Sequence, residues 1–274
     1  AGIHEKVVEP ETQFKNLKKS IQCGKNTISE YDKKIPSDLT AEQILIRSGN
    51  IGSVRIAQAI GLEKFKNFLD KLSLISAIKF DIEEVGIPIP FRWGKCKLAT
   101  TSYGHGITTT ILQLANAYSI IVNGGYKINP TLIKKKSKIK NKKILNNDVS
   151  KKINPILRKI VTTKEGTASL ANVDGYQVGG KTGTAQTSIV GGYSNKKINT
   201  FASVFPSSNP KYVFIVMLDE PKTNSEYIYN YRDGSGIKYK GTPFNTAGWT
   251  SVEVVGQIIE KIGPILATKY NEVY

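Results

Sequence analysis

The sequence is poor in the residues that build metal centres and lacks the long apolar runs that cross membranes. Its 274 residues include two cysteines, two histidines and one methionine. Neither a C-x-x-C motif nor a zinc-ligand spacing is present, which argues against a metal site. The longest uninterrupted apolar run, Val213–Leu218, is far shorter than the roughly 18 residues of a membrane-spanning helix. We therefore expect a soluble chain with a substantial core.

The two cysteines, Cys23 and Cys96, leave two interpretations open. In an oxidising compartment they could form a disulfide, but the sequence does not show that their Cα atoms come within the required reach of about 7 Å. Unpaired cysteines behave as small apolar residues and are commonly buried. From the sequence alone, we prefer two buried free thiols.

Arginine is scarce, although the chain is strongly basic. The net charge is +17, yet only five of the 39 basic residues are arginine. Proteins that read DNA bases depend on arginine for paired hydrogen bonds, and no zinc-finger, homeodomain or RNA-recognition motif is present. The densest basic run, Lys134–Lys143, lies between turn-forming residues and is typical of a solvated surface excursion. We therefore predict no nucleic-acid partner.

Helices are predicted where apolar residues recur with a helical period. Between residues 51 and 72 one glycine interrupts this pattern, which indicates a pair of helices. Thr108–Thr110 supply N-caps for a later apolar helix that should belong to the core, and Gly124–Gly125 stop it. The predicted helices cover residues 51–72, 112–122, 149–161 and 251–262, and an irregular segment is expected at 81–93.

The period changes from helical to strand-like after residue 176. Strands are predicted at residues 176–181, 200–205 and 212–218, which would form an antiparallel meander. Residues 220–248 form a long excursion rich in tyrosine and glycine, a kind of loop that is usually functional or mobile. Helices followed by antiparallel strands predict an α+β fold with helices packed on an antiparallel sheet, as one domain over residues 1–274.

The segment Gly179–Gln186, GGKTGTAQ, is the most informative for chemistry. A lysine and two threonines on a strand flanked by glycines can place an ammonium and two hydroxyls beside a cleft, which suits an anionic, peptide-like ligand. The candidate residues are Lys181, Thr182, Gly183 and Thr184. GYQVGGKT also satisfies the phosphate-loop pattern, but its strand-like middle and the absence of a following helix argue against nucleotide binding.

A second motif, Ser48-Gly49-Asn50, stands 133 residues before Lys181. Alone, such a motif is more often a helix cap than a site. Together with K-T-G, it matches two of the three signatures of penicillin-recognising serine enzymes. The ordered stretches LTAEQILIRSGNIGSVRIAQAIG, ATTSYGHGITTTILQLANAYSIIVNGG and GYQVGGKTGTAQ closely resemble the transpeptidase domain of class B penicillin-binding proteins, above all the division-specific FtsI type.

This resemblance implies a fold, a reaction and a role for each candidate residue. The fold would be the penicillin-binding protein/β-lactamase-like transpeptidase fold. The reaction would be D,D-transpeptidation of peptidoglycan stem peptides through an acyl-serine, without a metal or organic cofactor. By this resemblance Ser48 would relay a proton, Asn50 would hold the donor amide, and Lys181 would supply positive potential. Thr182 and Thr184 would bind the substrate carboxylate beside Gly183, and the Thr184 N–H would form half of an oxyanion hole.

The same resemblance implies partners and a location. The ligands would be peptidoglycan stem peptides and β-lactams. The macromolecular partners would be a glycosyltransferase of the FtsW type and other division proteins. The chain would act at the periplasmic face of the bacterial inner membrane, with an anchor expected upstream.

The third family signature, S-x-x-K, supplies the nucleophile and its lysine. VEPETQFK places Thr12 and Lys15 at that spacing, but one apolar residue in the five after Lys15 cannot begin the buried helix that the family requires. We therefore expect a turn here, with the nucleophile upstream of Ala1 and absent from this chain, which would then be truncated and inactive. Two alternatives are a non-catalytic homologue that binds stem peptides and a hydrolase of the D,D-carboxypeptidase or β-lactamase kind.

Overall fold

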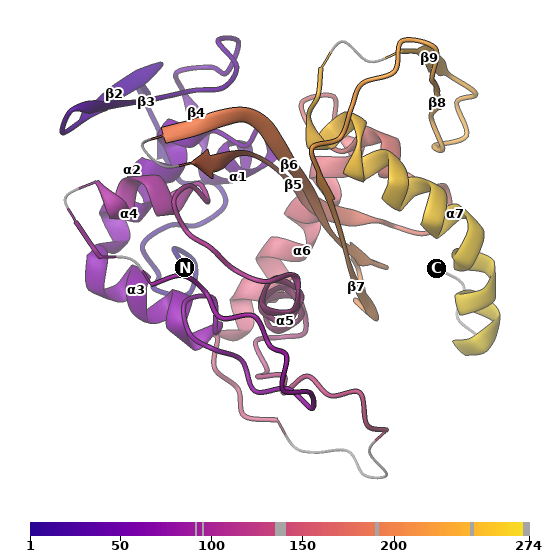
Figure 1. Ribbon diagram of the computed structural model, residues 1–274, viewed down its shortest axis with the longest axis horizontal. Coiled ribbons are helices and arrows are strands. Elements are labelled where there is room, and N and C mark those ends of the chain that lie inside the picture. The colour runs from indigo at the N-terminus through magenta and orange to yellow at the C-terminus, as the bar shows by residue number, and fades with distance from the viewer. Residues whose placement is uncertain (91, 95, 135–140, 190–191, 242–243, 271–274) are drawn as a thin grey trace. The chain divides into compact units, whose positions relative to one another are not determined.

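The computed structural model of the chain describes residues 1–90, 92–94, 96–134, 141–189, 192–241 and 244–270. The chain forms two compact units, Ala1–Ile153 and Asn154–Tyr274, whose elements are labelled in Figure 1. The middle of the basic run, residues 135–140, lies outside the described residues. Lys134, Lys142 and Lys143, which flank it, are exposed, as expected of a solvated segment.

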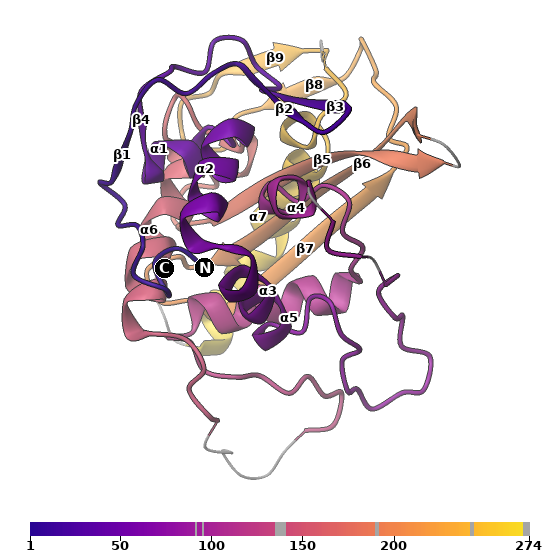
Figure 2. The same ribbon diagram turned by 90° about the vertical axis from the view of Figure 1, so that its left-hand side faces the viewer.

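In the described part of the first unit, two short antiparallel strand pairs precede a group of helices (Figure 2). The strands are β1 (Gln13–Phe14) with β4 (Leu39–Thr40), and β2 (Ser20–Cys23) with β3 (Asn26–Ser29). The helices are α1 (Ala41–Ile46), α2 (Asn50–Ile60), α3 (Leu62–Lys71), α4 (Lys97–Ser102), α5 (Ile111–Val122) and α6 (Asn147–Thr162), the last of which continues into the second unit. These four strands were not predicted, because each is only two to four residues long.

The predicted helix boundaries in this unit are confirmed. Gly61, at a φ of 83°, separates α2 from α3, as the glycine interruption indicated. The Thr110 hydroxyl accepts a hydrogen bond from Gln113 N, and the Gln113 side chain accepts one from Thr110 N, so that both cap α5. Gly125 stops this helix at a φ of 85°, where a Cβ would come within 2.7 Å of the Leu145 carbonyl. The described residues of 81–93 are irregular, as predicted.

The interior around α5 is more polar than the sequence suggested. Ala117 and Ile120 pack with Phe68 of α3 and with Leu72, the C-cap of that helix, which confirms that α5 contributes to the core. However, Gln113 is fully buried, and its amide nitrogen donates to the carbonyls of Ser73 and Ser76 at 2.8 and 2.6 Å. A polar side chain can be buried there because the loop after α3 presents carbonyl oxygens that need donors.

The expectation of free thiols is wrong. Cys23, at the end of β2, and Cys96, the N-cap of α4, form a disulfide with a Cα–Cα distance of 5.7 Å. Helix α2 packs against both β3 and α4, which brings the two cysteines together across 73 residues of sequence. This long-range packing is invisible in the sequence pattern.

The second unit is built on a three-stranded antiparallel sheet of order β5-β6-β7. Its elements are η1 (Ser169–Ala171), β5 (Gly179–Ile189), β6 (Gly192–Phe205), β7 (Tyr212–Asp219), β8 (Ile228–Asn230), β9 (Lys238–Lys240), η2 (Ala247–Trp249) and α7 (Ser251–Tyr270). The predicted meander is therefore confirmed. Helix α7 packs against β6 and β7 through buried residues such as Val255 and Ile259 (Figure 1). It extends eight residues beyond the predicted end, with Pro264 inside the helix.

Candidate functional site

In the first unit, Ser48 lies in the turn between α1 and α2. Arg47 caps the end of α1, and Ser48 adopts a left-handed conformation with a φ of 57°. The N–H groups of Ser48 and Gly49 donate to the carbonyls of Leu45 and Ile44, at 3.2 and 2.9 Å. Two helices thus meet at a tight turn, in which Ser48 stands between Arg47, the C-cap of α1, and Gly49, the N-cap of α2.

The N-terminus of α2 is capped by Glu30, a residue that the sequence analysis missed. Its two carboxylate oxygens accept hydrogen bonds from the N–H groups of Asn50 and Ile51, at 2.7 and 2.9 Å. The carboxylate also lies at the positive end of the helix dipole. The Asn50 side-chain amide donates to the Ser29 carbonyl at 2.8 Å. Asn50 is therefore fixed through both its backbone and its amide nitrogen, which leaves its side-chain oxygen as an acceptor for a ligand N–H.

In the second unit, the predicted K-T-G-T residues lie on β5, which forms one edge of the three-stranded sheet. The register places Lys181 opposite Ala202 and Thr184 opposite Asn199. The two neighbouring glycines have different environments. A Cβ on Gly180 would come within 2.6 Å of the Ala202 carbonyl, whereas a Cβ on Gly183 would meet its nearest atom at 4.0 Å. Gly180 therefore allows close packing, and Gly183 leaves open space beside an exposed strand.

The polar side chains of this strand are oriented by contacts within the second unit. The Lys181 ammonium donates to the Thr182 carbonyl at 2.8 Å, and burial lowers the pKa of Lys181 from 10.5 to about 8. The hydroxyls of Thr182 and Thr167 lie 2.7 Å apart. The Thr184 hydroxyl accepts a hydrogen bond from Ala247 N at 3.0 Å, so that its own proton can be donated to an anion.

Ala247 ends the excursion of residues 220–248, which is anchored on α7. Arg232 forms two 2.8 Å hydrogen bonds with the Glu253 carboxylate, and both side chains are 5% exposed. Tyr229 and Tyr239 pack on Trp249, with ring centroids 5.2 and 5.0 Å apart. A charged pair and an aromatic cluster thus hold the loop that reaches Thr184. Sequence motifs could not reveal these contacts, because the residues in each contacting pair are 10 to 21 positions apart.

Thr12 and Lys15 do not lie in a helix, which agrees with the turn expected for this segment. The Thr12 hydroxyl accepts a hydrogen bond from Glu9 N at 2.8 Å within a turn, and β1 follows directly. The pattern S-x-x-K itself occurs at four serines among the described residues, namely Ser76, Ser194, Ser208 and Ser235. None of these four lies in a helix, where positions i and i+3 share a face. A fifth match, at 137–140, lies outside the described residues.

The described residues contain no group of three or more histidine, cysteine, aspartate or glutamate side chains that could hold a metal ion. Nor, in the same part of the chain, is any helix sufficiently long and apolar to cross a membrane. The candidate residues thus form two sets, each described within its own unit. One set is Ser48 and Asn50, and the other is Lys181–Thr184.

Comparison with known sequences identifies the family of the chain. The model of the penicillin binding protein transpeptidase domain matches residues 1–235. The chain is 28% identical, over 90% of its length, to a protein of Caulobacter vibrioides named "Probable peptidoglycan D,D-transpeptidase FtsI", and spans 41% of that relative. It is 30% identical, over 80% of its length, to a protein of Neisseria flavescens named "Probable peptidoglycan D,D-transpeptidase PenA", and spans 55% of that relative. The chain therefore corresponds to about half of the length of these relatives.

Comparison with solved structures confirms the expected fold. The transpeptidase domain of penicillin-binding protein 3 from Burkholderia pseudomallei matches with a TM-score of 0.80 at 24% identity, over 96% of this chain and 75% of that chain. This agreement extends to the α+β architecture with its antiparallel sheet. Because the family model covers most of the sequence and the fold agrees, the chain belongs to the penicillin-binding protein transpeptidase domain family.

Proposed function

We propose that the protein is a peptidoglycan D,D-transpeptidase of the FtsI type, which cross-links stem peptides during septal cell-wall synthesis. In the proposed reaction a serine hydroxyl attacks the carbonyl of the penultimate D-alanine, and the terminal D-alanine leaves. The acyl group then passes from the serine to an amine of a neighbouring stem peptide. β-Lactams would acylate the same serine.

The observation that carries this proposal is the position of β5 at the edge of the three-stranded sheet, with Gly183 and Thr184 exposed. An extended peptide can pair with the backbone of an edge strand, and the open space at Gly183 permits its close approach. The Thr184 hydroxyl, which already accepts from Ala247 N, has its proton available for the terminal carboxylate. The Lys181 ammonium adds positive charge on the same strand. This combination of groups suits a peptide that ends in a free carboxylate.

The remaining roles follow the family signatures. We assign to Ser48 the transfer of a proton to the leaving amine, and to Asn50 the binding of the donor amide through its side-chain oxygen. Thr182 would bind the carboxylate together with Thr184, whose N–H would form half of the oxyanion hole. The nucleophilic serine and its lysine are expected outside the present sequence, because none of the described S-x-x-K matches lies in a helix.

The disulfide supports a location outside the cytoplasm. Stable disulfides are typical of oxidising compartments such as the bacterial periplasm, and Cys23 and Cys96 are paired. We therefore propose that the protein acts at the periplasmic face of the inner membrane. By family resemblance, its partners there would be an FtsW-type glycosyltransferase and other division proteins.

Ligand-observed NMR with two peptides tests the binding step without requiring turnover. One peptide ends in D-Ala-D-Ala with a free carboxylate, and the other is its C-terminal amide. The carboxylate form should bind more tightly, and Thr184→Val should abolish that preference, whereas Thr27→Val on β3 should not. Equal binding of the two peptides by the unaltered protein would contradict the proposal.

A second experiment separates transfer from the two alternatives. One sample of the protein, with any coding sequence found upstream of Ala1, is incubated with a fluorescent penicillin, and a second, unlabelled sample is incubated with a donor peptide and an acceptor amine. Mass spectrometry should show a labelled serine upstream of Ala1 and a cross-linked product. Hydrolysed donor with no cross-linked product would indicate a carboxypeptidase or β-lactamase. Peptide binding without any label would indicate a non-catalytic homologue.

A further inference from the structure

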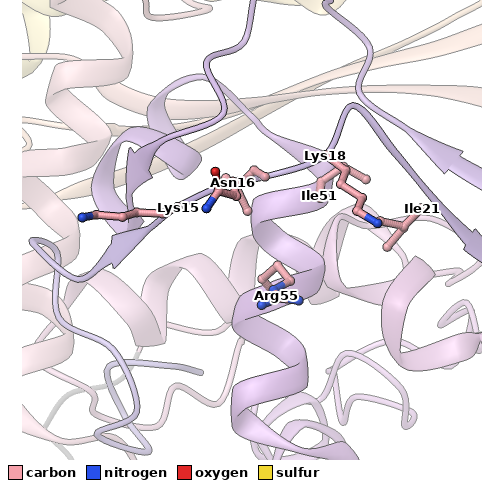
Figure 3. A pocket seen from close by; sticks show the side chains of 7 residues that line it. Lys15, Asn16, Lys18, Ile21, Ile51 and Arg55 are labelled. Atoms are coloured by element: carbon pink, nitrogen blue, oxygen red, sulfur yellow. The ribbon is translucent and has the colours of Figure 1, made fainter.

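A pocket of about 410 Å³ lies in the first unit, between the chain that joins β1 to β2 and helix α2 (Figure 3). Three cationic residues line it: Lys15, Lys18 and Arg55. Apolar residues of the core, Leu17 and Ile51, form its inner surface together with the half-buried Ile21. The pocket therefore combines an apolar interior with a basic rim.

The wall of this pocket is fixed by hydrogen bonds. Asn16, at a φ of 55°, donates its N–H to the Asp38 carboxylate at 2.8 Å, and Leu17 donates its N–H to the Ser37 carbonyl at the same distance. Leu17 is only 7% exposed and packs in the same cluster as Ile51. The segment is thus held in place before any ligand arrives, which lowers the entropic cost of binding.

The three cations have no counter-charge of their own. Lys15, Lys18 and Arg55 form no ion pair with any residue that the structure describes, and all three are exposed. The pocket lining contains no carboxylate. Two carboxylates accept hydrogen bonds from backbone N–H groups of lining residues, Asp38 from Asn16 and Glu30 from Ile51. The rim therefore attracts anions, and this attraction should weaken as salt rises.

The directions of the side chains favour an extended ligand. Figure 3 shows the ammonium of Lys15 pointing away from Lys18, with Arg55 projecting from α2 between them in this view. A single phosphate would require donors that converge on one point. Separated cations around an apolar interior instead suit a chain that carries several spaced carboxylates and an apolar side chain.

We propose that this pocket binds an acidic peptide segment of a partner protein, with one apolar side chain inserted against Leu17 and Ile51. The site is separate from the proposed catalytic function and does not depend on it. Its occupant would contact Ile51, the residue directly after Asn50. The Ile51 N–H donates a hydrogen bond to the Glu30 carboxylate. The segment of Lys15, considered above as part of a catalytic motif, thus becomes part of a docking site.

Fluorescence anisotropy with a labelled peptide, Glu-Asp-Leu-Glu-Asp-Leu-Glu, tests the proposal on the full chain. Replacement of its leucines by serine, or of its carboxylates by amides, should each weaken binding. The double variant Lys18→Glu/Arg55→Glu should lower the affinity by about tenfold, since each reversed rim charge removes an attraction and adds a repulsion. Lys222→Glu/Lys238→Glu, on exposed residues of the second unit, changes the net charge equally and should leave the affinity within about twofold.

Several outcomes would overturn the proposal. These are no binding by the unaltered chain, or equal losses for the two double variants. Equally tight binding of dextran sulfate, with no effect of the leucine replacements, would instead indicate a general polyanion surface. Arg55→Gln, which removes the charge without reversing it, checks that any loss follows the charge, and thermal melts should show that all variants are folded.

Discussion

Ser48 lies in the turn between α1 and α2 and Asn50 begins α2, whereas Lys181–Thr184 occupy a strand. The turn is held by single contacts from distant parts of the sequence, among them the Glu30 carboxylate and the Ser29 carbonyl. The strand is held by backbone pairing with β6, which is uninterrupted from Gly179 to Gln186. Each of these residues is therefore also held through the paired residues before and after it. Loss of one of these hydrogen bonds should therefore disturb the turn locally, whereas the strand should be disrupted only by a steric conflict with β6.

The largest effect is expected from the disulfide, which encloses the turn but not the strand. The Cys23–Cys96 bond closes a loop across 73 residues, and a loop of that length is worth about 4 kcal/mol in a chain-entropy estimate. The double variant Cys23→Ser/Cys96→Ser should lose that much free energy of unfolding, as measured by urea denaturation. Hydrogen exchange should accelerate in α1 and α2. An equal acceleration in β5 and β6 would contradict the separation of the two regions.

The next effect is steric and concerns the strand. Gly180→Ala should destabilise the protein by about 2–3 kcal/mol, because the new Cβ conflicts with the backbone carbonyl of Ala202. Gly183→Ala provides the matched control on the same strand and should change stability by less than about 0.5 kcal/mol. Under the proposed function, it should nevertheless weaken binding of the carboxylate peptide. Equal melting temperatures for the two variants would refute this distinction.

A smaller effect is expected when the cap of α2 is weakened. Glu30→Gln keeps the size of the side chain but loses its charge and one acceptor oxygen, which should cost about 1–2 kcal/mol. The Asn50 and Ile51 amides should exchange faster with solvent, as followed by NMR. Glu63→Gln, in the first turn of α3, removes an equivalent charge and serves as the control. Unchanged exchange at both amides would show that the turn does not depend on this contact.

The smallest effect is a dependence on pH that arises from the strand. Lys181 has a lowered pKa of about 8, so in the unfolded chain it holds its proton to higher pH than in the folded protein. Stability should therefore rise with pH above about 8 until the unfolded value of 10.5 is reached, with a gain of about 1 kcal/mol between pH 7 and 9. Lys181→Met should lack this rise. Denaturation curves at several pH values, compared between the two proteins, would detect it.

The features that were predictable from the sequence are those set by interactions between residues close together in the chain. The α2–α3 break at Gly61, the capping of α5 by Thr110 and the meander around β6 were predicted, because they follow from local periodicity, caps and glycine positions. The disulfide and the buried Gln113 were not, because each depends on partners that lie far away in the sequence. The short strands β1 to β4 were missed because each is only two to four residues long, too short to show an alternating pattern.

The candidate site shows the same division. The sequence by itself determined which residues we propose for the chemistry, because S-x-N and K-T-G-T are short motifs whose residue types suit an anionic peptide ligand. Only the tertiary structure decided how each residue is held. Glu30 fixes Asn50, and Ala247 orients the Thr184 hydroxyl, in both cases through hydrogen bonds between residues at least 20 positions apart. Local patterns do not record such contacts, because they form only when separate elements pack together.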